Sequence, residues 1–299
     1  MSLRLAVATE DFGTPLRRAI PLAGKAQVPG IRLNARRDIL AENMSASGLK
    51  QLAQYIRENR MQVAGLNCPT RHSLAAPEFL EERVQLIRSA MELARPLQTS
   101  SLIVPCGLIP DPEQADPAPD DSNSSIDQQA NPFSFATAGS SDSTTPTSAD
   151  RFSTLCEVVS DLARHGNHVG CTLTLQLPNY DIALIERLMT AVITEPLQIV
   201  FDPAVTVFTG ADAILTYRNV YRHVGYVRAR DGIRNSDFSG TETAVGDGTV
   251  NWEELLPTLI EAEFTHWVCI ERTGGDHRET DVFNSVTRVK SLLPRPADG

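Results

Sequence analysis

The sequence contains few cysteines, and those it has stand far apart. Cys68, Cys106, Cys156, Cys171 and Cys269 include no Cys-x-x-Cys pair, and their number is odd. Structural zinc sites and disulfide frameworks use closely spaced or paired cysteines. The spacing therefore argues against both and favours a reduced, cytoplasmic protein.

Long hydrophobic runs and clusters of basic residues are missing as well. No stretch approaches the roughly eighteen apolar residues that a membrane span needs, and the apolar run at residues 1–9 is too short for a signal peptide. The net charge is −10 without any Lys- or Arg-rich segment, whereas a nucleic-acid partner requires a basic surface. We therefore expect neither a nucleic-acid nor a membrane partner, and the sequence leaves a homo-oligomer open.

What the chain does have is a regular alternation of short β-rich apolar runs and longer stretches with helical periodicity. With 299 residues, 41% of them hydrophobic, it is long enough for one large barrel or two small domains. The expected strands are 3–8, 30–33, 63–66, 101–105, 171–176, 197–201, 223–229 and 267–270. The expected helices are 15–26, 45–59, 77–97, 150–165, 180–193, 211–221, 252–262 and 281–293. Ser45 or Ser47 is the expected cap of the second helix, and Asp150 that of the fourth.

Eight strand–helix units in strict alternation predict an α/β fold of the (β/α)₈ barrel type, formed as a single domain by residues 1–299. An open, doubly wound sheet is the alternative, but it leaves eight regular units unexplained.

One segment, 107–149, interrupts this alternation after the fourth strand. It is acidic, rich in Ser, Pro and Asp, and contains no Lys or Arg. Such a composition buries too little apolar surface to offset the entropy of ordering. We therefore expect a disordered insertion on the carboxyl-terminal face of the barrel. The alternative is an acidic lid, held through the aromatic residues of segment 131–135.

Polar residues follow most of the expected strands, and in such barrels the strand ends carry the chemistry. These residues are Glu10 and Asp11 after the first strand, the segment 67–72 with His72 after the third, Gln176 after the fifth, Asp202 after the sixth, Arg228, Arg230 and Asp231 around the end of the seventh, and Glu271 after the eighth. Their convergence predicts a polar pocket at the barrel mouth.

Two motifs near the carboxyl terminus point to a family. Segment 226–232 (Tyr-Val-Arg-Ala-Arg-Asp-Gly) is followed by segment 246–252 (Gly-Asp-Gly-Thr-Val-Asn-Trp) and, after one helix, by segment 268–271 (Val-Cys-Ile-Glu). Together they resemble the last two units of the sugar isomerase/epimerase family, the xylose-isomerase-like barrels. Segment 199–203 (Ile-Val-Phe-Asp-Pro) fits the same family.

The resemblance implies a divalent metal (Mn, Mg, Co or Zn) held by Glu, Asp, His and Glu from strands five to eight. It also implies that the two Glu residues move a proton beside a sugar carbonyl. The residues at these positions here are Gln176, Asp202, Arg228 and Glu271. Arg234 matches an Arg that holds substrate in some epimerases.

Two of these four residues change the expected chemistry. Gln176 does not ionise near neutral pH, so it is no proton-shuttling base. Arg228 has no free lone pair and keeps its charge, which repels a divalent ion. We therefore expect no metal, or one weakly bound through Asp202 and Glu271, and a guanidinium paired with these carboxylates.

The predicted function is that of a sugar or sugar phosphate isomerase/epimerase, an enzyme of carbohydrate metabolism acting on a small sugar-like ligand. Glu271 is the expected base, and Arg228 or Arg230 the group that stabilises the enediolate. Gln176, His72, Arg230 and Arg234 are the expected substrate contacts. The alternative is a catalytically inactive barrel that binds a ligand or a partner; the endonuclease chemistry of related barrels needs His ligands that are largely missing.

Simpler roles stand beside these. Asp202 before a Pro also suits a turn, Glu271 also suits a solvated ion pair, and His72 is a single loop His. Gly246 and Gly248 favour turn geometry over a phosphate-binding loop, because an isolated Gly-x-Gly is weak evidence for phosphate.

Overall fold

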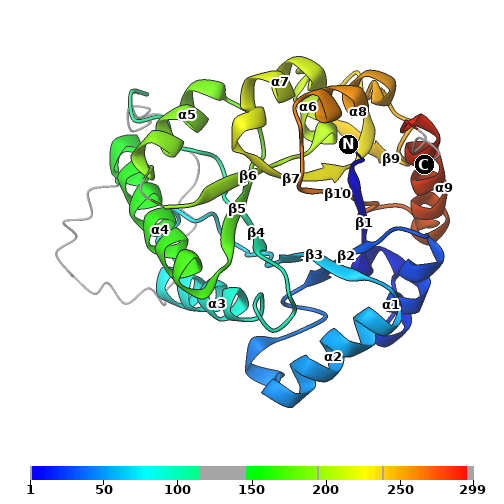
Figure 1. The fold of residues 1–299 in the computed structure, drawn as a ribbon. Coiled ribbons are helices and arrows are strands. Elements are labelled where there is room, and N and C mark those ends of the chain that lie inside the picture. Colours follow the sequence, from blue (N-terminus) through cyan, green and yellow to red (C-terminus); the bar gives the residue numbers. More distant parts are fainter. Residues whose placement is uncertain (1, 115–145, 194, 238, 295–299) are drawn as a thin grey trace, which may run out of the picture.

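The computed structural model describes residues 2–114, 146–193, 195–237 and 239–294. Its eight parallel strands close into a barrel in the order β1-β10-β7-β6-β5-β4-β3-β2 (Figure 1). The first and last strands of the barrel pair directly, with Arg4 opposite Trp267 and Val7 opposite Ile270. The protein is therefore a TIM barrel, as predicted. Its strands are β1 (Arg4–Ala8), β2 (Gly30–Asn34), β3 (Gln62–Asn67), β4 (Ser101–Pro105), β5 (Thr172–Gln176), β6 (Leu197–Phe201), β7 (Val224–Ala229) and β10 (Trp267–Ile270).

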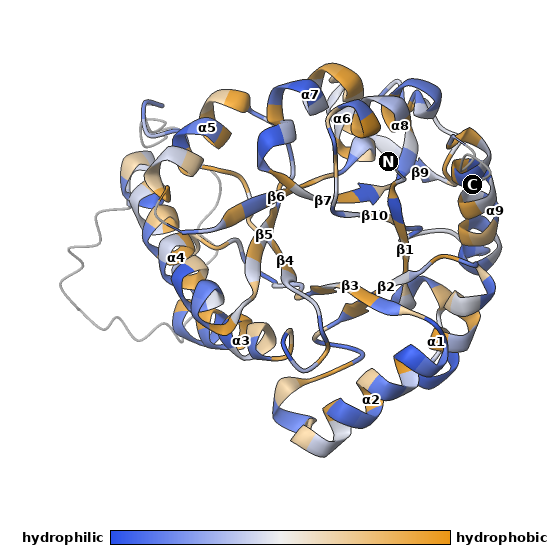
Figure 2. Cartoon of the chain, viewed as in Figure 1, coloured by the Kyte–Doolittle hydropathy of each residue, from blue (hydrophilic) through white to orange (hydrophobic). Residues whose placement is uncertain are grey.

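Helices surround the barrel, and each carries both hydrophobic and hydrophilic residues (Figure 2). They are α1 (Leu16–Lys25), α2 (Ala46–Glu58), α3 (Leu80–Glu92), α4 (Ser148–Val169), α5 (Ile182–Ala191), α6 (Pro203–Thr209), α7 (Ala213–Val220), α8 (Trp252–Glu261) and α9 (Arg278–Leu292), with the short 3₁₀ turns η1 (Thr9–Phe12), η2 (Ala41–Asn43) and η3 (Tyr221–His223). The predicted strands agree with these bounds within about two residues, because each is a short apolar run that helices cover on one side.

Helix caps follow from local hydrogen bonds. Ser45 is the N-cap of α2, as expected, and its side chain accepts a hydrogen bond from the Gly48 amide at 3.1 Å. The expectation that Asp150 caps α4 is wrong: Thr147 is the cap, and Asp150 lies three residues further on, where the two close a capping box. Glu or Gln is the usual residue at that position in a capping box. Here the Asp150 carboxylate accepts the hydrogen bond from the Thr147 amide at 3.0 Å.

Two features of the region after β6 and β7 were not predicted. The first is helix α6, which starts directly after Asp202. The second is an antiparallel hairpin of β8 (Asp231–Arg234) and β9 (Gly240–Thr243), which packs on α6. The ring of Phe208 in α6 lies against Gly232 and Gly240, where an added Cβ would come within 2.4 and 2.1 Å of it. Only glycine therefore allows the hairpin to lie this close.

Inside the barrel, small residues leave room for large ones. Ala6, Ala8 and Ala64 line the interior together with Tyr226 and Trp267. The larger apolar cluster lies between the strands and the helices. Because β1 and β3 contribute alanines to the interior, long polar side chains from β2, from β7 and from Glu271 after β10 can extend across it.

The predicted insertion 107–149 falls mostly on residues 115–145, which lie outside the described residues, as does the aromatic segment 131–135. Its flanks are described. Ile109 packs against the core, and Glu113 forms an ion pair with Arg187 at 2.8 Å. Among the described residues, no helix is both long and apolar enough to cross a membrane.

Candidate functional site

A chain of alternating guanidinium and carboxylate groups crosses the carboxyl-terminal mouth of the barrel. We call it the guanidinium–carboxylate chain. Its ion pairs are Glu10–Arg32 (2.5 Å), Arg32–Glu271 (3.3 Å), Glu271–Arg228 (2.7 Å), Arg228–Asp202 (3.9 Å), Asp202–Arg230 (2.8 Å), Arg230–Glu242 (3.1 Å) and Glu242–Arg272 (3.7 Å). The chain joins residues that follow or belong to β1, β2, β6, β7, β9 and β10, so its geometry depends on the closed barrel.

Glu271 and Arg228 form the buried centre of this chain. They extend from the neighbouring strands β10 and β7, where Cys269 lies opposite Arg228. Arg228 Nε and Nη2 both contact Glu271 Oε2, at 2.8 and 2.7 Å. Burial raises the pKa of Glu271, but attraction to Arg228 and Arg32 outweighs it and leaves the pKa below its ordinary value. The pair is therefore charged at neutral pH.

Asp202 has two roles at once, because it caps a helix and pairs with an arginine. Its Oδ1 accepts a hydrogen bond from the Ala204 amide at 3.1 Å, which starts α6. Its Oδ2 accepts one from Arg230 Nη1 at 2.8 Å. The Tyr180 hydroxyl accepts a hydrogen bond from the Asp202 amide at 2.6 Å and donates one to the Val200 carbonyl at 3.0 Å. Asp202 can therefore start the helix with one oxygen and bind Arg230 at the barrel mouth with the other.

Arg32 is one of three residues of the guanidinium–carboxylate chain that were not predicted from the sequence; the others are Glu242 and Arg272. Arg32 lies on β2 with a side chain only 1% exposed, and its Nη2 contacts both Glu10 and Glu271. Its Nε and Nη1 have no hydrogen-bond partner among the described residues, and neither does Glu271 Oε1. The sequence signal was an Arg between Ile31 and Leu33 in an expected strand. A charged residue in a buried strand needs a charged partner.

Asp11 is a second acidic group next to this centre. It is buried after β1 and accepts a hydrogen bond from the Arg272 amide at 2.9 Å. Burial and the nearby negative charge of Glu271 raise its pKa to about 7. Asp11 is therefore a carboxyl group that changes its protonation state near neutral pH.

The predicted site residues fall into two groups. Arg228, Arg230, Asp202 and Glu271 come together in the guanidinium–carboxylate chain. Gln176 ends β5, is half-buried and forms none of the ion pairs of the guanidinium–carboxylate chain.

His72 and Arg234 lie apart from the chain. His72 is exposed in the loop after β3, with its ring 6.2 Å from that of Phe79. Arg234 lies on the hairpin with its guanidinium against Gly210, the residue after α6. Asp202 lies at the other end of that helix, roughly 12 Å away at 1.5 Å per residue.

The residues at the four positions that the family resemblance assigns to metal ligands, Gln176, Asp202, Arg228 and Glu271, do not fit a divalent ion. Among the described residues, no group of three or more His, Cys, Asp or Glu side chains is arranged to hold a metal. Glu271 Oε2 already accepts hydrogen bonds from Arg228, and Asp202 Oδ2 accepts one from Arg230. A divalent cation between these carboxylates would lie within a few ångströms of several guanidinium groups, where the repulsion is strong.

The Gly-x-Gly loop has a structural role. Asp231 is fully buried and accepts hydrogen bonds from the amides of Gly232, Gly246 and Val250 and from Trp252 Nε1, at 2.8–3.1 Å. Gly246 has φ of +95°, and a Cβ on Gly248 would lie 2.1 Å from Asp231 Oδ1. The glycines therefore let the loop wrap around Asp231, which agrees with the turn role expected from the sequence.

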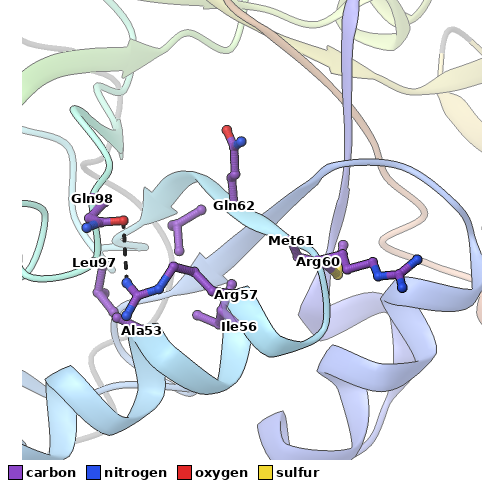
Figure 3. Close-up of a pocket in the computed structure, with 9 residues that line it drawn as sticks. Ala53, Ile56, Arg57, Arg60, Met61, Gln62, Leu97 and Gln98 are labelled. Carbon is purple, nitrogen blue, oxygen red and sulfur yellow. Dashed lines mark hydrogen bonds between the residues drawn. The ribbon is translucent and has the colours of Figure 1, made fainter.

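A surface cavity of about 410 Å³ lies elsewhere, beside the end of α2 and the start of β3 (Figure 3). Its floor is apolar, with Ala53 and Ile56, and Arg57 approaches Gln98 at 3.5 Å while Arg60 points away. The starts of the strands lie at the amino-terminal face, where barrels carry stability rather than catalysis. We therefore place the candidate site at the mouth.

Comparison with known proteins agrees with this architecture. The family model described as xylose isomerase-like TIM barrel matches residues 22–292, and the chain belongs to this family. No curated protein matches the sequence.

Solved structures resemble it over nearly their full length. A xylose isomerase domain protein from Planctomyces limnophilus superposes with a TM-score of 0.74 at 17% identity, covering 98% of both chains. An L-ribulose 3-epimerase gives 0.70 at 12% identity, covering 97% of this chain and 94% of its own. A xylose isomerase-like barrel from Mycobacterium smegmatis, in complex with magnesium, gives 0.65 at 13% identity, covering 97% and 96%. At these identities the likeness shows the fold alone.

Proposed function

We propose that this barrel binds a small sugar-like compound at its mouth and moves a proton beside the carbonyl group without a bound metal. One observation carries the proposal: the guanidinium groups of Arg32, Arg228 and Arg230 contact Glu271 and Asp202. The family resemblance assigns these two carboxylates to metal ligands. A guanidinium stabilises a developing oxyanion as a cation does, and it does so with directed hydrogen bonds.

Glu271 is the proposed base and Arg228 its partner. In the resting protein Arg228 lowers the pKa of Glu271, while burial alone raises it. A substrate oxygen that draws Arg228 away would leave Glu271 buried with less compensation, and its basicity would rise. Glu271 then takes the proton from the carbon next to the carbonyl, and Arg228 donates hydrogen bonds to the enediolate oxygen. Return of the proton gives the isomer or epimer.

Arg230 and Gln176 are the proposed substrate contacts at the mouth. Arg230 is partly exposed and already hydrogen bonded to Asp202, so it can donate to a hydroxyl group from a fixed position. Gln176 offers both a donor and an acceptor, which suits a polyol. His72 would reach such a substrate only from the loop after β3, and Arg234 only from the hairpin.

A second function has a specific observation in its favour. The side chain of Glu271 is 0% exposed and that of Arg228 only 7%, so a substrate reaches the base only after Arg228 moves. If the pair stays closed, the barrel binds a ligand or a partner at Arg230 and Glu10 without catalysis.

Exchange of substrate protons with solvent distinguishes the proposed metal-free reaction from binding without catalysis. The protein is incubated in D₂O with a panel of ketoses, aldoses and their phosphates, with and without a chelator, and proton NMR follows the signal next to the carbonyl. The proposal expects exchange that persists with chelator and is lost in Glu271→Gln. Ligand-induced stabilisation without any exchange supports the binding function instead, and exchange abolished by chelator contradicts the metal-free reaction.

A further inference from the structure

Glu242 lies in a site made of hydrogen-bond donors. Its Oε1 accepts from Arg230 Nε at 3.1 Å and from the Thr273 amide at 3.0 Å. Its Oε2 accepts from the Thr273 hydroxyl at 2.5 Å and from the Gly274 amide at 3.1 Å. Arg272 Nη1 lies 3.7 Å from the same oxygen. Both carboxylate oxygens thus have two hydrogen bonds, and two guanidinium groups face them.

The donors and the carboxylate belong to different elements. Thr273 and Gly274 form the loop after β10, whose next residue, Gly275, has φ of +91°. Glu242 comes from the hairpin strand β9. Successive amides of a glycine-containing loop, a hydroxyl and guanidinium groups are the chemistry that binds phosphate and carboxylate groups. The loop is therefore an anion-binding site that a side chain of the same protein fills.

Its position suits a substrate. The site lies between the loops that follow β7 and β10, the seventh and eighth strands of the barrel, where barrels of this type often hold a phosphate group. Arg230 bridges it to the reaction site, because its Nη1 donates to Asp202 at 2.8 Å while its Nε donates to Glu242. An anion in this site would direct the rest of a small molecule toward Asp202 and Arg228.

The hairpin does not need Glu242 in order to keep its place. Asp231 at its base accepts hydrogen bonds from Gly246, Val250 and Trp252, and Phe208 packs against its glycines. The Glu242 side chain is also 11% exposed, so it can turn toward solvent without unfolding the strands.

We propose that the loop after β10, together with Arg230, binds the anionic group of the substrate, a phosphate or a carboxylate, and that Glu242 occupies this site until the substrate displaces it. The assignment of the anion to a substrate rests on the proposed function, whereas the presence of the anion site does not.

Calorimetric titration of the full-length protein with inorganic phosphate tests the site. Glu242→Gln keeps the shape but removes the competing charge, and we expect it to bind phosphate at least tenfold more tightly than wild type. Adding Thr273→Val removes one donor and should reverse most of that gain. Glu253→Gln is the matched control, because Glu253 is an exposed acid that pairs with Arg288 at 3.3 Å, and it should behave as wild type.

Two further arms complete the test. Glu242→Asp has a shorter side chain that cannot reach all donors, so it should also gain affinity even if Glu242→Gln fails to fold. Titration with acetate in place of phosphate distinguishes a carboxylate site from a phosphate site. Folded Glu242 variants that bind both anions no better than wild type and Glu253→Gln would overturn the proposal. Because no turnover is measured, that result leaves the proposed reaction untouched.

Discussion

Two buried carboxylates near the end of β7 are stabilised in opposite ways. Asp231 is surrounded by neutral donors, three amides and an indole, of which the Gly246 and Val250 amides and the indole come from the loop that ends at Trp252. Glu271 is held by the guanidinium groups of Arg228 and Arg32, and its Oε1 has no hydrogen-bond partner among the described residues. A carboxylate whose hydrogen bonds come from neutral donors, most of them in one loop, fixes that loop. A carboxylate held by paired charges, with an unused lone pair, can change partner. The difference separates a structural carboxylate from a candidate catalytic one.

The largest expected effect comes from removing the structural carboxylate. Asp231→Ala leaves four donors without their acceptor, and each unsatisfied donor costs about 1–3 kcal/mol. We expect the free energy of unfolding to fall by on the order of 5 kcal/mol, measured by urea denaturation. Asp247→Ala, an exposed acid of the same loop, is the control and should change it by less than about 0.5 kcal/mol. A loss below about 1 kcal/mol would mean that Asp231 does not organise the loop.

Breaking the charged pair should cost slightly less and should be reversible. Arg228→Met leaves Glu271 with Arg32 as its remaining buried partner, and removing one member of a buried pair costs about 3–5 kcal/mol. Arg228→Met combined with Glu271→Leu removes both charges and should recover most of that loss. A double-mutant cycle measures the coupling. If the double variant is no more stable than Arg228→Met, the two side chains are not an isolated pair.

Restoring the family's ligand types tests the metal site. Gln176→Glu with Arg228→His supplies Glu, Asp, His and Glu at the four positions. A ligand that binds only the folded state at a hundred times its dissociation constant adds about 2.7 kcal/mol, so Mn²⁺ or Mg²⁺ should raise the melting temperature of this variant. Wild type should show no such rise, and elemental analysis should find no stoichiometric metal in it. A metal bound by wild type, or a variant that ignores metal, would show that β7 is aligned wrongly with the family.

The smallest expected effect concerns pH. Asp11 has a pKa raised to about 7 by burial and by Glu271, above its unfolded value of about 3.9. Between these values the folded state holds a proton that the unfolded state has released, so Asp11 lowers stability as pH rises through this window. Asp11→Asn should therefore gain stability over wild type from pH 4.5 to 7.5, by about 1–2 kcal/mol after allowance for coupling to neighbouring charges. A constant difference between the two proteins across this range would contradict the raised pKa.

Much of the fold could be predicted from the sequence because strands of a barrel are apolar and helices separate them. The site was predictable where a polar residue ends such a strand, as at Asp202 and Glu271. Arg32 was missed because it lies inside a strand, where a buried charge depends on Glu10 and Glu271, which follow β1 and β10.

The hairpin and α6 were missed for a different reason. The hairpin pairs short segments rich in Gly, Thr and Asp, and its contacts are glycines against Phe208. Such close packing leaves no periodic pattern in the sequence. Arg234 was assigned to the site by its resemblance to a substrate-binding Arg of some epimerases, whereas the hairpin carries it toward Gly210.

The contacts of Glu271 and Asp11 also tie the beginning of the chain to its end. Arg32 forms an ion pair with Glu271, more than 230 residues later in the sequence. Asp11 accepts a hydrogen bond from the amide of Arg272, which lies 261 residues later. A growing polypeptide that has not yet produced β10 therefore carries Arg32 and Arg228 without their shared counter-charge. Such an intermediate has only Glu10 as a partner for Arg32 and Asp202 as a partner for Arg228, so burying these cations costs more than in the closed barrel. Pairing of β10 with β1 and β7 is thus also the step that gives these two guanidinium groups the carboxylate that they share.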